Sequence, residues 1–322
     1  MAGFIAAGLV RIGVVRADDA DATAPGIKAL AEALKDSDDD VRKNAALSLG
    51  RFGPKAEPAV PALVAALKDK VVDVRGASAV ALGRIGPGAK EAARPLADLL
   101  KDKEPDIRGA AGLALARIGK GASAAVPTLL DVAKRDDTLS AVYARGALAV
   151  LDDKPDPHVA AIAEALADKM ADVRGAAAYV LAELGPAAKS AVPALVKALG
   201  DDEVDVRRGV ARALAEIGSA ASGELPNLIE ALKDHDATVR SQLILTLASI
   251  GPPAKIALPQ LIELTTDKSL DVRGSAVYAL GEIGWADKSV VSALSKALKD
   301  GDAEIRKAAA TAMGKLENDE NQ

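Results

Sequence analysis

The sequence has 322 residues, a net charge of -5 and no cysteine, and only 2% of its residues are aromatic. The lack of cysteine excludes disulfides, thiolate metal sites and cysteine catalysis, and the acidic balance argues against a general nucleic-acid binder. Half of the residues are hydrophobic, and a core of Ala, Leu, Val and Ile suits closely stacked helices.

The N-terminal segment, residues 1–24, permits two interpretations. One is a secretory signal over residues 1–17, although no positive charge precedes its apolar run and Arg11 interrupts it. The other is the end of a partial repeat, because Ala6–Gly13 matches Ala79–Gly86 at five of eight positions. The repeat interpretation favours a cytoplasmic protein and the signal an exported one. No other stretch is long and apolar enough to span a membrane.

From residue 25 to residue 317 the sequence repeats every 33 residues. A pattern of Asp, Val and Arg marks most units, and its central position falls at nine evenly spaced residues without an internal insertion. These are Val41, Val74, Ile107, Ser140, Val173, Val206, Val239, Val272 and Ile305, which we number as units one to nine. Self-similarity at this period predicts a one-dimensional solenoid of about nine stacked units.

Each unit predicts two helices. In the second helix, apolar residues stand 0, 4, 7, 8 and 11 positions after the mark and form one helical face. An aspartate such as Asp73 precedes the mark as a predicted N-cap, and a glycine such as Gly86 follows the last apolar position as a predicted left-handed C-cap. The first helix is typified by Pro61–Asp69, where the proline marks the first turn or a kink.

An arginine follows the mark in eight of the nine units. The helix dipole disfavours a cation in the first turn of a helix, but an aspartate recurs in step at the turn between the two helices, as at Asp69 and Asp201. This spacing predicts an Asp–Arg ladder between neighbouring units, with a row of anion-binding arginines as the alternative. The ladder arginines are Arg42, Arg75, Arg108, Arg174, Arg207, Arg240, Arg273 and Arg306.

Unit four departs from the pattern. Leu139, Ser140 and Ala141 replace Asp, Val and Arg, and Asp152–Asp153 replaces the usual Gly-Pro. The ladder should break here, which predicts a change of curvature or a hinge between residues 135 and 157. The chain's last residues, 318–322, are predicted to form a polar tail.

The recurring pattern, typified by "DVRGASAVALGRIG" (Asp73–Gly86) with a proline early in the preceding helix, resembles the HEAT repeat. It is most similar to the short, phycobilisome-lyase-type subclass, and the resemblance covers residues 25–317. It implies an all-α, right-handed superhelix of about nine two-helix units. It also implies that the second helix of each unit lines the concave surface.

No arrangement of residues indicates catalysis or metal binding. The two histidines, His158 and His235, lie in different units without a recurring partner, whereas zinc requires three or four ligands. No nucleophile elbow is present, and the paired carboxylates recur as a turn motif would. We therefore predict no catalytic, cofactor-binding or metal-binding residue, and a protein that is not an enzyme.

The positions 6 and 10 residues after the mark lie opposite the core. Position 10 is basic in the first third of the chain and mainly acidic later, and position 6 carries several Leu and Tyr residues. Such side chains are typical of a protein-binding groove, unless they merely pack against adjacent helices. The predicted partner-binding residues are Arg51, Arg84, Arg117, Tyr179, Glu183, Arg212, Glu216, Leu245, Tyr278 and Glu282.

These features predict a non-catalytic scaffold that binds a protein or an extended peptide on its concave face. Two alternatives stay open. The resemblance implies an accessory factor in chromophore attachment, and the arginine row at Arg51, Arg84 and Arg117 would suit a nucleic-acid backbone, although aromatic residues for base stacking are scarce.

Overall fold

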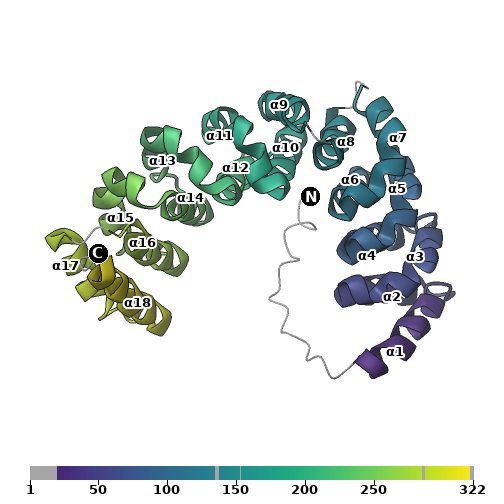
Figure 1. Cartoon of the computed structure of the whole chain (residues 1–322), viewed down its shortest axis with the longest axis horizontal. Helices are drawn as coiled ribbons and strands as arrows, with labels where there is room; N and C mark the ends of the chain where they lie inside the picture. Colours follow the sequence, from purple (N-terminus) through teal and green to yellow (C-terminus); the bar gives the residue numbers. More distant parts are fainter. Residues whose placement is uncertain (1–19, 135–137, 153, 285–286, 320–322) are drawn as a thin grey trace.

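The computed structural model describes residues 20–134, 138–152, 154–284 and 287–319, and all of their regular structure is helical. Within these residues the helices form nine consecutive pairs, which follow an open arc with an outer and an inner layer (Figure 1). The prediction of an all-α solenoid of two-helix units is confirmed. No described helix is long and apolar enough to cross a membrane.

The first helix of each pair lies in the outer layer of the arc and the second in the inner layer (Figure 1). The outer helices are α1 (Ala20–Ala33), α3 (Val60–Ala66), α5 (Ala93–Leu99), α7 (Val126–Val132), α9 (Asp156–Glu164), α11 (Val192–Ala198), α13 (Leu225–Ala231), α15 (Leu258–Leu264) and α17 (Lys288–Ala297). The inner helices are α2 (Asp39–Phe52), α4 (Val72–Ile85), α6 (Pro105–Ile118), α8 (Thr138–Leu151), α10 (Ala171–Leu184), α12 (Val204–Ile217), α14 (Ala237–Ile250), α16 (Leu270–Ile283) and α18 (Ala303–Asp319).

Short 3-10 segments join an inner helix to the outer helix that follows. They are η2 (Gly53–Ala59), η3 (Gly86–Ala92), η4 (Gly119–Ala125), η6 (Gly185–Ala191), η7 (Gly218–Glu224) and η8 (Pro252–Ala257), while η5 (Ala165–Ala167) follows α9. Pro61 occupies the start of α3, where the missing N–H would have no partner in any case. The proline therefore marks the first turn of an α-helix that continues a 3-10 segment.

Glycines with positive φ follow seven of the nine described inner helices, although only Gly284 takes the left-handed α conformation predicted for a C-cap. Gly53 has φ 55° and ψ -133°, and five further glycines share this conformation. Proline follows at Pro54, and the residue before a proline avoids helical ψ values. Backbone of this kind strains any side chain, so glycine is required where an inner helix turns directly into a 3-10 segment.

The predicted N-caps are wrong by two residues. The helix α4 begins at Val72, so Asp73 lies in its first turn and Val71 occupies the cap position without a side-chain hydrogen bond. A capping carboxylate occurs at Asp38, which accepts hydrogen bonds from two backbone N–H groups at the start of α2. The recurring aspartates therefore act on the helix dipole from within the first turn.

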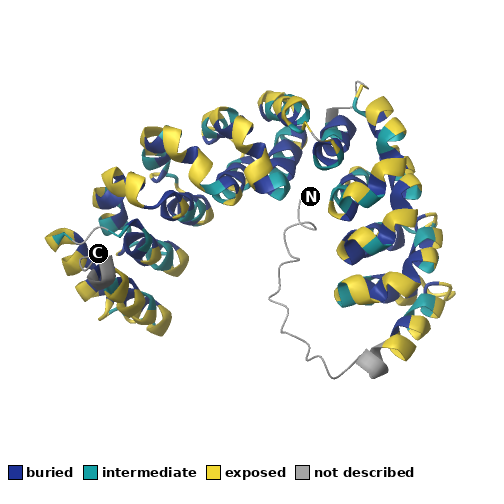
Figure 2. Ribbon diagram, in the orientation of Figure 1, coloured by how far each residue is buried: buried dark blue, intermediate teal, exposed yellow. Residues whose placement is uncertain are grey.

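The core lies between the two layers, where Figure 2 shows the buried residues. Leu82 of α4 and Leu63 of α3 are both completely buried. Neighbouring inner helices approach closely because small residues face each other: a Cβ added to Gly50 would lie 3.1 Å from the Cα of Ala81. Truncating such a leucine to alanine costs about 2–5 kcal/mol, so this continuous core supplies much of the stability.

The ends of the solenoid differ from the predicted boundaries. The first helix, α1, begins at Ala20, inside the predicted N-terminal segment 1–24. The secretory signal or partial repeat was predicted within that segment, and residues 1–19 of it lie outside the described residues. The last helix, α18, reaches Asp319. Residues 318 and 319, predicted to belong to the polar tail, are therefore helical.

Candidate functional site

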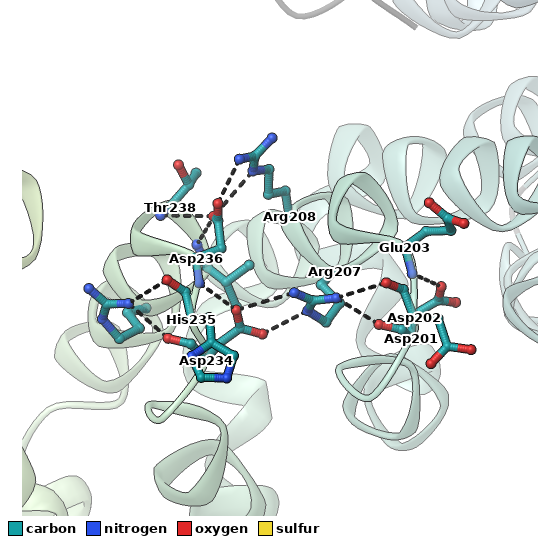
Figure 3. Close-up of polar contacts among 11 residues, drawn as sticks. Asp201, Asp202, Glu203, Arg207, Arg208, Asp234, His235, Asp236 and Thr238 are labelled. Carbon is teal, nitrogen blue, oxygen red and sulfur yellow. Dashed lines mark hydrogen bonds and ion pairs between the residues drawn. The ribbon is translucent and has the colours of Figure 1, made fainter.

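One ladder arginine shows how neighbouring units are joined. Arg207 donates from Nε and Nη2 to the carboxylate of Asp234, at 2.7 and 3.4 Å. Its Nη1 donates to the backbone carbonyls of Asp201 and Asp202, at 2.9 and 3.2 Å (Figure 3). A single guanidinium thus ties the turn of its own unit to the turn of the next, which offsets its unfavourable place in the first helical turn.

The same arrangement recurs along the chain. Six arginines bind an aspartate 27 residues later: Arg42 with Asp69, Arg75 with Asp102, Arg174 with Asp201, Arg207 with Asp234, Arg240 with Asp267 and Arg273 with Asp300. The two remaining ladder arginines, Arg108 and Arg306, donate to the carbonyls of their own turns. Because these guanidinium groups are engaged within the frame, their geometry favours a structural ladder over an anion-binding row.

The ladder also holds its carboxylates in the charged form. The hydrogen bond from Arg42 lowers the pKa of Asp69, although burial acts in the opposite direction. The hydrogen bond from Arg174 lowers the pKa of Asp201 in the same way. Each carboxylate additionally accepts a backbone N–H two residues later, as Asp201 does from Glu203 at 2.9 Å.

Unit four, formed by α7 and α8, is joined differently. Ala141 stands at the ladder position and is buried, so it offers no guanidinium to the next turn. Arg145 instead donates to the carbonyl of Ala133 at 3.1 Å. Tyr143 is buried beside Gly109, and desolvation raises its pKa to about 12. The hinge that the sequence suggests at this unit stays a prediction.

The ten predicted partner-binding residues all lie on inner helices, between α2 and α16. Arg51, Arg84 and Glu216 are exposed, and the described residues provide no ion-pair partner for them. Glu282 is bound by Lys315, which also lies over the ring of Tyr278 at 5.6 Å. Only part of the predicted row is therefore available to a partner without rearrangement.

Glu183 is the centre of a cluster that links three units. Arg117 and Arg212 donate to its two carboxylate oxygens at 2.8 and 3.0 Å, and the Arg212 guanidinium lies 5.2 Å from the centre of the Tyr179 ring. Burial alone would raise the pKa of Glu183, but the two arginines outweigh it and lower the pKa. The bond from Arg117 spans 66 residues and crosses unit four, a contact that sequence reasoning missed.

The residues of this spanning ion pair also line a pocket of about 290 Å³. It is lined by Gly112, Leu113, Ala116, Arg117, Tyr143, Gly146, Ala147, Val150, Val180, Glu183 and Leu184. Unit four supplies Gly146 and Val150 at the two groove positions, and Val180 of α10 packs against Gly146, with its Cγ1 2.4 Å from the place that a Cβ there would take. The sequence signal was available, because Gly146 is the only glycine at its position among the nine units.

The apolar groove residues are less exposed than the binding interpretation expected. Tyr278 is 48% exposed, but Tyr179 and Leu245 are half-buried. Burial raises the pKa of the Tyr179 phenol, and the nearby Glu183 adds to that shift. For Tyr179 and Leu245 the structure therefore agrees better with the alternative, packing against adjacent helices, while Tyr278 presents its ring to solvent.

The histidines hold no recurring position. His158 Nε2 lies 3.3 Å from Asp152 Oδ2, and the backbone carbonyl of His235 accepts from Arg240. Among the described residues no group of three or more His, Cys, Asp or Glu side chains is placed to hold a metal ion.

The two-layer arc and the ladder define a class, the α-solenoids built from helix pairs. The family model for HEAT repeats matches residues 27–93, 60–149, 159–225, 192–280 and 258–321. The chain therefore belongs to the HEAT-repeat family, and the predicted resemblance is confirmed. HEAT repeats are generally a non-catalytic scaffold fold that binds proteins.

Two solved structures share the fold. One is an engineered protein, 24% identical, with a TM-score of 0.51, a match that covers 94% of this chain and 92% of the other. The second is YibA of Escherichia coli, 20% identical, with a TM-score of 0.56, covering 96% of this chain and 99% of YibA. Comparison with curated proteins finds no match. Likeness at these identities concerns the fold alone.

Proposed function

We propose that this chain is a non-catalytic scaffold that binds a protein or an extended peptide along its concave face. The observation that carries this proposal is the unequal use of charge in the molecule. The six paired ladder arginines are engaged inside the frame, whereas Arg51, Arg84 and Glu216 on the inner helices are exposed and have no ion-pair partner among the described residues.

The charge order along the inner helices favours a polypeptide over a nucleic acid. A phosphate backbone requires a continuous basic track, but the row of Arg51, Arg84 and Arg117 gives way to Glu183 and Glu216 within the same groove. A polypeptide carries both signs of charge and is able to match this reversal. No feature of the described groove specifically favours chromophore attachment.

Site-specific photo-crosslinking tests this function. A photoreactive phenylalanine analogue would replace Tyr278 on the inner helix α16, and in a control protein it would replace Ile256 in η8, which precedes the outer helix α15. The two side chains are similarly exposed, at 48% and 54%. In an extract of the source organism, we expect protein adducts from position 278 in clear excess over position 256.

The outcome also separates the alternatives. Equal protein adducts at both positions would contradict the proposed concave-face function. Adducts that disappear with nuclease treatment would favour the nucleic-acid alternative, and adducts with tetrapyrrole absorbance would favour chromophore attachment. A competing excess of unlabelled protein should remove genuine adducts at position 278.

A further inference from the structure

The pocket at unit four is a distinct feature of the concave face. Its walls come from three consecutive inner helices, α6, α8 and α10, and most of its lining is aliphatic or glycine. Leu113, Val150 and Val180 contribute apolar surface, and Val180 packs directly against Gly146, because its Cγ1 lies 2.4 Å from the place that a Cβ on Gly146 would take. A cavity of about 290 Å³ with this lining has room for one large aliphatic side chain.

The polar groups at the pocket wall do not call for a charged guest. Arg117 and Glu183, the two charged residues of the lining, are paired with each other at 2.8 Å, and Arg212, which is not part of the lining, binds the same carboxylate. A charged side chain entering the pocket would lose its hydration without gaining an unpaired counterion. An apolar side chain loses no such hydration and gains about 25 cal/mol for each Å² it removes from water.

The charges that remain available stand on opposite sides of the pocket. Arg84 lies on α4, two units before α8, and Glu216 lies on α12, two units after it. Arg84 occupies the last turn of its helix, where a cation is favoured. Glu216 also occupies a last turn, where the helix dipole disfavours a carboxylate. Because Glu216 has no ion-pair partner among the described residues, a cation from a partner would offset this unfavourable placement.

The distances between the pocket and the two charged residues set the spacing of the matching residues in a peptide partner. Packed helices lie about 8–10 Å apart, so two units correspond to about 16–20 Å. An extended peptide advances about 3.3 Å per residue, so about six peptide residues span the distance from the pocket to Arg84, and about six span the distance from the pocket to Glu216. Acidic groups would meet Arg84 and basic groups would meet Glu216.

We infer that the pocket at unit four is the anchor subsite for an extended peptide of defined charge polarity. The peptide places one aliphatic side chain in the pocket, an acidic residue about six positions to one side and a basic residue about six positions to the other. This inference rests on the proposed function, because it specifies the partner of the same concave face.

Selection from a displayed library of random peptides of about 16 residues tests the inference, since that length covers both charges and the anchor. The full-length protein would be the bait, and enriched peptides would be synthesised and measured by fluorescence polarisation. Ala116→Leu fills the pocket from α6. Ala215→Leu places the same side chain at the equivalent, equally half-buried position of α12, outside the pocket, and serves as the matched control.

We expect enriched peptides to share an aliphatic residue flanked by opposite charges at this spacing. Filling the pocket should weaken binding about tenfold or more, as expected for the loss of one buried aliphatic side chain, and Ala215→Leu should leave it nearly unchanged. Arg84→Glu and Glu216→Lys should each weaken binding by at least about two- to fivefold. Thermal unfolding of every variant would verify that it is folded.

The alternative outcomes are separable. Two results would overturn the anchor subsite: enriched peptides that lack the shared pattern, and peptides that bind Ala116→Leu as tightly as wild type. If such peptides still lose affinity with Arg84→Glu, the proposed concave-face function stands. Peptides that bind every concave-face variant equally well would contradict the proposed function itself. A selection that enriches no peptide would contradict both.

Discussion

Unit six and unit four show two ways in which neighbouring units are joined. In unit six, Arg207 uses Nε, Nη1 and Nη2 on two turn carbonyls and the next carboxylate. In unit four, Ala141 has no such group, and residues of this unit line a pocket on the inner face. The residues that repeat build the frame, and the candidate site lies where the repeat changes.

The ion pairs of the ladder and the pair between Arg117 and Glu183 differ in burial as well as in their position in the fold. The side chains of Arg174 and Asp201 are 16% and 7% exposed, whereas Arg117, which spans unit four, is 41% exposed. A buried pair leaves an uncompensated charge when one partner is removed, while an exposed pair is screened by water and salt. We therefore expect ladder substitutions to affect stability and groove substitutions mainly to affect binding.

The largest effect is expected for Arg174→Ala in α10. The substitution leaves the buried carboxylate of Asp201 without its bidentate partner and removes two bonds to turn carbonyls. We expect a loss of about 3 kcal/mol in the free energy of unfolding, measured by chemical denaturation. Unchanged stability together with lost ligand binding would instead assign the arginine row to anion binding.

The second prediction compares the loss of stability on replacing two equivalent aspartates, one at a regular junction between units and one at the irregular junction after unit four. Asp201 receives Arg174, while Asp168 faces unit four, where Ala141 replaces the arginine. Asp201→Asn should cost about 2 kcal/mol because it removes a charge-assisted pair. Asp168→Asn should cost less than about 1 kcal/mol. Equal losses in urea denaturation would show that the junctions do not differ as described.

The ladder also predicts how stability depends on pH. Hydrogen bonds from arginine lower the folded-state pKa of Asp69 and Asp201, so the unfolded chain binds more protons in the acid range. Their contribution is present above the unfolded pKa of about 3.9 and is lost as pH falls through the folded pKa. Urea denaturation at a series of acidic pH values should show this loss, and Asp201→Asn should make it shallower.

A smaller effect is expected where the inner helix α10 ends. Gly185 has φ 53°, a conformation that costs a residue with a side chain about 1–2 kcal/mol, so Gly185→Ala should destabilise the protein by that amount. Gly175 lies within the same helix with open space around its missing side chain. There, alanine should stabilise by about 0.5–1 kcal/mol. The same sign of change for both variants would contradict this conformational account.

The smallest effect on stability is expected for Arg117→Gln. The half-exposed pair with Glu183 should contribute no more than about 1 kcal/mol, and added salt should reduce that contribution. Thermal unfolding at low and high salt measures both quantities. A loss as large as that of Arg174→Ala would make the spanning pair part of the frame.

The frame was predictable from the sequence because each of its interactions repeats. The 27-residue separation of Arg207 and Asp234 recurs in five other units, and the helix-ending glycines recur with the period. The predicted caps failed because Asp73 lies inside the first turn. The position of a turn residue fixes which backbone N–H groups it reaches, and periodicity alone does not determine that position to within one or two residues.

The candidate site was only partly predictable, because it depends on contacts between units that do not recur with the 33-residue period. The sequence placed Arg117 and Glu183 on the same face, but it gave no sign that they meet across unit four. Similarly, Leu139, Ser140 and Ala141 indicated an irregular unit, while the pocket depends on how α6, α8 and α10 approach one another. The spacing and orientation of the helices decide such contacts, and the sequence does not specify either to within the few ångströms that an ion pair requires.

Hydrogen exchange of the full-length protein, with and without a saturating enriched peptide, tests the central claim most directly. Binding at the inner face of unit four predicts that the peptide slows exchange in α6, α8 and α10, and that Ala116→Leu removes this protection. Exchange in the outer helices α5, α7 and α9 should change little. Protection confined to the outer helices, or no protection at saturation, would contradict the account.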